Sequence, residues 1–275
     1  MPANKATPPP HRRIGPNFRA AHDYKELIKR WRKVAAKTGL KMRRFARAGK
    51  QDIFYLESPA PKKSQQLSEK NKPAIYLSAG IHGDEPAAPA ALIHWAEKNT
   101  KRIAALRCLI FPCLNPWGLI NNCRCDSQGR DLNRSYHDNS IEQTAAHKKL
   151  LCGKRFDLAI ALHEDYDACG YYLYATNHAE STFAKKMLNT AARHIPIDNR
   201  KEIDGIRCAN GLILPKILPK FRKQLPEALL LVTENTNTTF TLESPSEYFL
   251  DDRILAHNAV LDLITASLLF PPPTN

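Results

Sequence analysis

The stretch AIYLSAGIHGDEPAAPAALIHW, residues 74–95, decides the fold. Its first six residues form a short apolar run after a polar loop, which predicts a buried strand at 74–79. A turn carrying His82 and Glu85 follows, and a helix is expected from about Pro86, a residue that suits the first helical turn. Open α/β sheets place their ligands at such turns, where a buried strand ends. The stretch therefore predicts a central strand followed by a ligand-binding turn.

His82 and Glu85 carry the chemistry of this turn. Their spacing lets an imidazole nitrogen and a carboxylate point at one place, which supplies two of the three protein ligands of a catalytic zinc. The same residues could instead cap a helix, because H-x-x-E is a short motif with many chance occurrences. The remainder of the chain has to decide between these two interpretations.

The positive charge of the chain is concentrated near its beginning. Residues 1–50 hold fifteen Lys and Arg against Asp23 and Glu26, while the net charge of the whole chain is +14, so the other 225 residues are close to neutral. A basic segment can bind nucleic acid, but no nucleic-acid motif accompanies this one. We expect a solvated basic face and, over residues 1–20, a Pro-rich N-terminal arm, with no nucleic-acid partner.

Composition also restricts where the protein works. No apolar run approaches the roughly 18 residues of a transmembrane span, and the N-terminal sequence lacks the apolar region of a secretory signal. The seven cysteines are odd in number and have no paired spacing, and the C-x-C of Cys123 and Cys125 lacks a second pair. We expect a cytoplasmic protein with reduced cysteines and no membrane partner.

The rest of the chain alternates between predicted strands and helices. Helices are expected at 24–37, 141–151, 179–194 and 251–269, and strands at 42–47, 52–57, 107–113, 157–162, 170–176, 228–233 and 239–243. Residues 62–72 are expected to be a polar surface loop, and 195–227 to be irregular. This alternation predicts a three-layer α/β/α sandwich on a mixed, mostly parallel sheet, in a single domain at 21–275.

Two further polar clusters follow predicted strands. His163 ends the apolar run at 157–162, and the polar segment NPWGLINNCRCDSQGRDLNRSY occupies residues 115–136. Long irregular segments inside a compact domain are usually functional. A lone histidine at a strand end is more often structural, and Asn133-Arg134 could belong to a salt bridge. These parts together, however, fit one metal site.

The combined motifs resemble those of the zinc carboxypeptidases, the peptidase M14 family. The matching segments are H-x-x-E at 82–85, N-P-x-G at 115–118, D-L-N-R at 131–134, His163 at a strand end, and F-T-L-E at 240–243. The resemblance covers roughly residues 74–265 and is strongest to short bacterial members, which include murein-peptide amidases. The succinylglutamate desuccinylase and aspartoacylase group shares H-x-x-E and D-L-N-R and is the main alternative.

The resemblance implies a metal centre with one zinc ion per chain. His82, Glu85 and His163 would hold the zinc and leave an open position for water. The zinc would lower the pKa of that water to about 7 and polarise the scissile carbonyl. A second metal near His137, Asp138 and His147 is an alternative that we do not favour.

The resemblance also implies roles around the metal. Arg124 would stabilise the developing oxyanion, and Asn133 and Arg134 would clamp the terminal carboxylate of the substrate. Glu243 would be the general base for the attacking water and then the acid for the leaving amine. Glu234 also follows a strand-like run and competes for this role, but F-T-L-E matches the family and favours Glu243.

Two departures from the family pattern leave details open. Carboxypeptidases of this family use a mobile-loop tyrosine ahead of the base, but residues 205–227 contain no tyrosine, and Tyr248 comes after Glu243. Arg130 stands before Asp131, where small or apolar residues are common. This arginine could favour an acidic substrate, or it could point to solvent.

The sequence as a whole predicts a zinc-dependent hydrolase that cleaves an amide bond adjacent to a free carboxylate. The preferred interpretation is a metallocarboxypeptidase, a metalloprotease acting on peptides. The first alternative is an N-acyl amino acid deacylase of the succinylglutamate desuccinylase/aspartoacylase type. The second is a non-catalytic basic interaction protein, which is disfavoured because no proposed ligand or base is missing. The natural substrate and the oligomeric state stay open.

Overall fold

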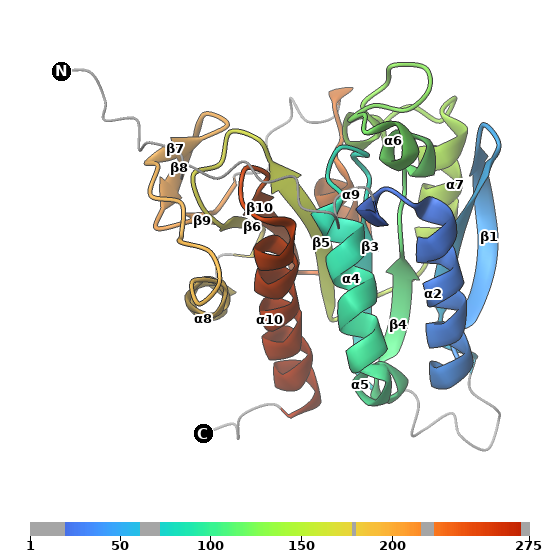
Figure 1. Ribbon diagram of the computed structural model, residues 1–275, viewed down its shortest axis with the longest axis horizontal. Coiled ribbons are helices and arrows are strands. Elements are labelled where there is room, and N and C mark those ends of the chain that lie inside the picture. Colours follow the sequence, from blue (N-terminus) through green and yellow to red (C-terminus); the bar gives the residue numbers. More distant parts are fainter. Residues whose placement is uncertain (1–19, 61–71, 178–179, 216–222, 271–275) are drawn as a thin grey trace.

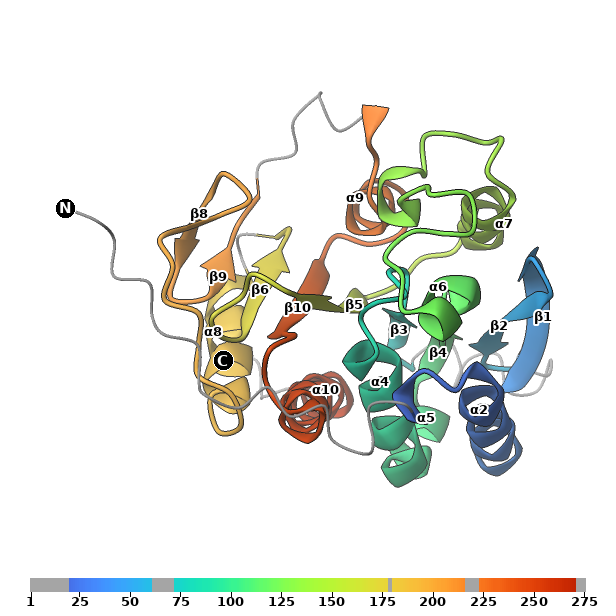
Figure 2. The same cartoon turned by 45° about the horizontal axis from the view of Figure 1, so that its top comes forward.

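The central feature of the fold is a mixed sheet with helices on both faces (Figures 1 and 2). The structure is a computed structural model that describes residues 20–60, 72–177, 180–215 and 223–270. Residues 1–19 of the expected arm and 62–71 of the expected polar loop lie outside this range. The described strands follow the order β1-β2-β4-β3-β5-β10-β6-β9-β8-β7 across the sheet. Their bounds are β1 Lys41–Ala48, β2 Gln51–Glu57, β3 Ala74–Ala79, β4 Arg107–Phe111, β5 Leu158–Asp165, β6 Tyr172–Ala175, β7 Glu202–Ile203, β8 Ile206–Ala209, β9 Leu212–Ile213 and β10 Thr239–Pro245.

Parallel pairing is concentrated at the centre of the sheet. Strands β4, β3, β5 and β10 run parallel to one another, whereas β1–β2, β2–β4 and β10–β6 are antiparallel. The expected hairpin of β1 and β2 lies at one edge of the sheet. Because parallel strands end at the same edge, the residues at the carboxyl ends of β3, β5 and β10 are brought together.

The helices divide into two layers, as Figure 2 shows. Their bounds are α2 Tyr24–Thr38, α4 Ala87–Lys98, α5 Thr100–Ala105, α6 Pro116–Asn121, α7 Glu142–Leu151, α8 Ser181–Ala191, α9 Glu227–Glu234 and α10 Leu250–Leu269. Helices α2, α4, α8 and α10 cover one face of the sheet, and α7 and α9 cover the other. The expected α/β/α sandwich is confirmed.

The sequence of strand β3 is apolar except at Ser78, and the packing on both faces of the strand gives the reason. Ile75 and Leu77 point into the larger core, which also contains Trp31 and Trp95, while Tyr76 points into the core under α7 and α9. All six residues of the strand are buried. A strand covered on both faces has no position for a solvated side chain, so alternation is absent and the run is continuous.

Three local predictions are wrong or incomplete. Residues 228–233, expected to be a strand, belong to helix α9, which begins after Pro226. The region expected to be irregular contains the short strands β7, β8 and β9. Strands β5 and β10 continue to Asp165 and Pro245, so His163 lies within its strand rather than after it, and Glu243 is not the last residue of its strand. A short apolar run fits a buried strand and a buried helix equally well, and its tertiary contacts decide.

None of the described helices combines the length and apolar character needed to cross a membrane.

Candidate metal centre and active site

The turn after β3 owes its shape to close backbone packing. A Cβ atom on Gly83 would lie 1.9 Å from the carbonyl carbon of Gly118 in α6, so no other residue fits without a shift. The Gly83 N–H donates to the carbonyl of Cys123 at 3.1 Å. The H-x-x-E turn and the N-P-x-G helix are therefore built against each other, and glycine is required at both contact positions.

The three predicted metal ligands lie together in the structure. His82 Nδ1 is 2.5 Å from Glu85 Oε1, and His163 Nδ1 is 2.9 Å from Glu85 Oε2. Candidate ligand atoms of all three residues lie within 4.8 Å of one another, and all three side chains are buried. Within the described part of the chain, this is the one group of three or more such residues that could hold a metal ion.

The charges in this cluster suit a divalent cation. Burial lowers the pKa of His82, but the Glu85 carboxylate and a hydrogen bond to Asp131 outweigh it and raise the pKa to about 9. Burial raises the pKa of Glu85, but His82 and His163 together hold it below its usual value. An ionised carboxylate thus faces two imidazole nitrogens. This donor set, two nitrogens and one carboxylate in a buried site, fits a zinc ion.

Asp131 orients the cluster, a role that the sequence analysis missed. Its Oδ1 lies 3.2 Å from His82 Nε2, and its Oδ2 accepts from Arg124 Nε at 3.2 Å and Nη2 at 3.0 Å. A carboxylate on the outer nitrogen of a metal-binding histidine fixes the orientation of its imidazole. The signal was available, since Asp131 begins the D-L-N-R motif.

Arg124 lies beside two of the candidate ligands. Its Nη1 is 3.3 Å from His82 Nδ1 and 3.8 Å from Glu85 Oε1. The buried Asn115 of N-P-x-G holds this segment, because its side chain accepts from Gly118 N at 2.9 Å and donates to the Cys125 carbonyl at 3.1 Å. A positive, partly exposed guanidinium is therefore held at the edge of the ligand cluster.

The structure brings Glu243 to the cluster and leaves Glu234 away from it. Glu243 on β10 is the direct strand partner of His163 on β5 and is 8% exposed. Burial raises the pKa of Glu243 well above its usual value, although the nearby His163 opposes this rise. Glu234 is exposed at the end of α9, next to Asn235, whose carbonyl accepts from Phe156 N near the start of β5. That is the opposite end of β5 from His163.

Comparisons with known proteins give a partial family match and a shared fold. Residues 71–202 match the model of the succinylglutamate desuccinylase/aspartoacylase catalytic domain, a range that includes the three candidate ligands and Arg124 but ends before Glu243. Among curated protein sequences, none matches the chain. A candidate metallopeptidase from Shewanella amazonensis has the same fold, with a TM-score of 0.77 and 22% identity over 92% of this chain and 95% of that chain. The chain thus has a carboxypeptidase-like fold, and nearly half of it resembles the desuccinylase/aspartoacylase catalytic domain.

Two further solved structures support the shared fold. A candidate metallopeptidase from Shewanella baltica has a TM-score of 0.75 and 22% identity, over 90% of this chain and 92% of that chain. A metallo-carboxypeptidase from Burkholderia cenocepacia has a TM-score of 0.64 and 12% identity, over 88% of this chain and 68% of that chain. The fold class expected from the sequence is thereby confirmed as carboxypeptidase-like.

The D-L-N-R loop lies beside the candidate ligands, because its Asp131 contacts His82. Arg134 is exposed, and its Nη1 donates to the Asn133 carbonyl at 3.0 Å. Asn133 Oδ1 accepts from the N–H of Glu227 at 2.9 Å, so one end of its amide is committed to the start of α9. Arg130 donates to Asp126 Oδ2 through both Nε, at 2.8 Å, and Nη2, at 2.5 Å. Arg130 is thus occupied by an internal ion pair.

Other residues considered in the sequence have structural surroundings. Both ring nitrogens of His147 contact tyrosine hydroxyls, Tyr136 at 2.7 Å and Tyr76 at 3.0 Å, so its position gives no support to a second metal. Tyr248 donates to the Cys169 carbonyl at 3.4 Å. Tyr166, which the sequence analysis did not single out, is 51% exposed and donates to the Asp84 carbonyl in the ligand turn at 3.0 Å.

Proposed function

We propose that this protein is a zinc-dependent hydrolase that cleaves an amide bond adjacent to a free carboxylate. The observation that carries the proposal is the convergence of His82 and His163 on Glu85, with Glu243 directly beside His163 in the sheet. A zinc ion bound by these ligands supplies Lewis-acid activation of the scissile carbonyl and of water. The other chemical roles fall to side chains of this chain.

Glu243 is proposed as the general base. Its carboxylate is buried and makes no hydrogen bond to any described residue, so it is available to take a proton from the attacking water. The raised pKa favours later delivery of that proton to the leaving amine, because a useful acid–base group has a pKa near the working pH. Arg124 beside the ligands is proposed to stabilise the negative charge that develops on the carbonyl oxygen.

Asn133 and Arg134 are proposed to bind the free carboxylate. The Oδ1 of Asn133 is engaged by Glu227, which directs the amide so that its NH2 group is the part left for a substrate. Beyond its contact with the Asn133 carbonyl, the guanidinium of Arg134 makes no hydrogen bond to a described residue. Its planar fork matches a carboxylate in a bidentate manner.

The substrate is proposed to be a peptide with a free C-terminus, which makes the protein a metallocarboxypeptidase. One observation favours a second candidate, hydrolysis of N-acyl amino acids. The region that holds the ligands, residues 71–202, matches the desuccinylase/aspartoacylase catalytic domain. Both substrate classes present an amide beside a carboxylate, so they require the same chemistry and differ in the pocket around it.

The test is a substrate panel with the purified, zinc-loaded full chain. C-terminally free peptides, N-acyl amino acids and the carboxamide of each are compared, and zinc content is measured alongside. Glu243→Gln should retain zinc and lose about 10² to 10⁴ in rate, the range typical of general acid–base groups. Glu234→Gln is the matched control and should keep its rate. Normal turnover in Glu243→Gln would remove the proposed base, and no hydrolysis by the zinc-loaded wild type would reject the function.

A further inference from the structure

The loop that carries Asn133 and Arg134 is attached to the start of α9 by three contacts. The N–H of Glu227 donates to Asn133 Oδ1 at 2.9 Å, and the N–H of Tyr136 donates to the Leu225 carbonyl at 3.2 Å. Ser135 and Leu225 also form an isolated parallel β-bridge. The loop therefore takes its position from a segment about ninety residues away in the sequence.

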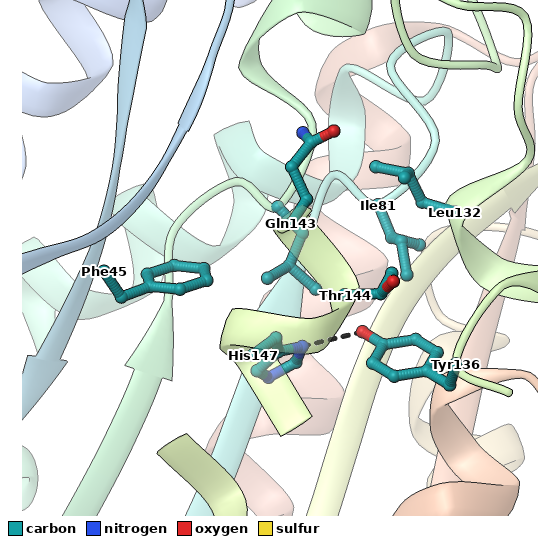
Figure 3. Close-up of a pocket in the computed structure, with 8 residues that line it drawn as sticks. Phe45, Ile81, Leu132, Tyr136, Gln143, Thr144 and His147 are labelled. Carbon is teal, nitrogen blue, oxygen red and sulfur yellow. Dashed lines mark hydrogen bonds between the residues drawn. The ribbon is translucent and has the colours of Figure 1, made fainter. Parts of the chain in front are cut away.

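Buried side chains also link the two sides of this attachment through a chain of hydrogen bonds from Tyr136 to Glu227. The hydroxyl of Tyr136 lies 2.7 Å from His147 Nδ1, as Figure 3 shows, and His147 Nε2 lies 3.0 Å from the hydroxyl of Tyr76. The Tyr76 hydroxyl in turn donates to the Glu227 carboxylate. Each of these four side chains is almost completely buried. We call Tyr76, Tyr136, His147 and Glu227 the support network.

With Glu227 ionised, the hydrogen bonds of the support network run toward its carboxylate. Tyr76 has a single hydroxyl proton and gives it to Glu227, so it must accept from an N–H at Nε2 of His147. Burial lowers the pKa of His147 to about 3, which keeps the ring neutral and its Nδ1 free of a proton. Nδ1 therefore accepts from Tyr136. Every donor has a defined acceptor, and the chain ends on the carboxylate of Glu227.

We propose that the support network positions Asn133 and Arg134 to bind the carboxylate of the substrate. Glu227 connects the support network to the loop. Its carboxylate accepts from the Tyr76 hydroxyl, while its backbone N–H donates to the side-chain amide of Asn133. Tyr136 makes the same connection from the other end of the loop. The four members are positioning residues and touch no substrate. The proposal rests on the proposed function, since it assigns these residues to the carboxylate site of that function.

The chain offers a matched control on the other face of the sheet. The hydroxyl of Tyr171 lies 3.1 Å from His257 Nδ1, and His257 Nε2 lies 3.0 Å from Ser244 Oγ. This pair is as deeply buried as Tyr76 and His147 but belongs to the core against α10. Tyr171→Phe therefore removes the same chemical group from a similar environment that has no contact with the D-L-N-R loop.

The experiment compares Tyr76→Phe, Tyr171→Phe and Arg134→Met in the zinc-loaded full chain. The substrates are the best free-carboxylate substrate of the panel and its carboxamide, and urea midpoints are recorded for each variant. Tyr76→Phe should raise KM for the free carboxylate by about tenfold, the equivalent of one hydrogen bond to a charged group, and leave the carboxamide unchanged. Tyr171→Phe should lower the urea midpoint without changing the ratio between the two substrates. In the Arg134→Met background, Tyr76→Phe should have no further effect on that ratio.

Two outcomes would overturn the proposal, and they are separable from failure of the proposed function. An unchanged substrate ratio in Tyr76→Phe, with a large change in Arg134→Met, would leave the carboxylate site intact and reject the support role. Additive effects of the two substitutions would do the same. Equal losses for both substrates in Arg134→Met would instead reject the carboxylate site itself, and the support role with it. If Tyr76→Phe does not fold, Tyr136→Phe interrupts the same chain of hydrogen bonds at its other end.

Discussion

Replacing Arg253 with methionine should destabilise the fold by about 3–5 kcal/mol, because it leaves a buried carboxylate without its counter-charge. Glu164 follows the candidate ligand His163 on β5, and its side chain is 0% exposed, while that of Arg253 on α10 is 5% exposed. One carboxylate oxygen of Glu164 accepts from Arg253, and the other accepts from the N–H of Ala87 in the first turn of α4. This single carboxylate therefore ties β5, α4 and α10 together behind the ligand turn.

The magnitude follows from the environment of the pair. Burial raises the pKa of Glu164, and the charge of Arg253 opposes that rise. Without Arg253, the remaining contacts of Glu164 are the Ala87 N–H and the Ser246 hydroxyl at 3.4 Å, which do not balance a buried charge. An exposed ion pair such as Lys29–Glu26 contributes about 0–1 kcal/mol at most, so Lys29→Met provides the control.

The assay is urea unfolding at pH 7 with the free zinc concentration held constant, because bound metal adds to the stability of the folded state. Arg253→Met should shift the midpoint strongly at unchanged m-value, and adding Glu164→Gln should restore part of the loss by removing the uncompensated charge. A loss below about 1 kcal/mol in Arg253→Met would refute the reasoning. So would a double variant that is less stable than Arg253→Met alone.

Three further predictions concern acid, metal and substrate. Burial lowers the pKa of His147 and His257 to about 3, while unfolded histidine titrates near 6.5. As pH falls through this window the unfolded state gains more protons, so each histidine should reduce stability by up to about 1.4 kcal/mol per pH unit; urea midpoints that stay constant from pH 7 to pH 5 would contradict this. His163→Ala should reduce zinc from about one per chain to almost none by elemental analysis, and full occupancy would remove His163 from the ligand set. Arg134→Met should cost about 2–5 kcal/mol of transition-state binding, measured as kcat/KM, for free-carboxylate substrates, and much less for their carboxamides.

Local sequence was enough to predict the central strand and the ligand turn. The run AIYLSA, in which five of six residues are apolar, predicted a buried strand, and strand β3 is found over the predicted residues. The helix predicted at 24–37 is likewise found as α2, with Asp23 accepting from Glu26 N at 2.9 Å at its start and Gly39 at a φ of 77° after its end. Each of these features depends on side chains within a few positions, so the physical cause is visible in the sequence itself.

Tertiary contacts decided α9 and, with it, the placement of the two glutamates. The apolar run after Pro226 suits a strand or a helix, and in the fold its first N–H is capped by Asn133 from a distant loop. The run forms helix α9, and Glu234 is the last, exposed residue of that helix. Glu243 reaches His163 because β10 lies parallel to β5 in register, a pairing that a single sequence does not display.

The same limit explains which parts of the site escaped the sequence analysis. His82, Glu85 and His163 were predicted because their residue types have a recognisable spacing and chemistry. The contacts that surround the site have no such spacing: Asp131 is 49 positions from His82, Arg253 is 89 from Glu164, and Glu227 is 151 from Tyr76. Glutamate, arginine and tyrosine are common on protein surfaces, and only burial against one another makes them part of a site. Residue types and spacing along the chain were therefore enough to predict the candidate ligands, whereas the contacts that surround them depend on which distant segments the fold packs together.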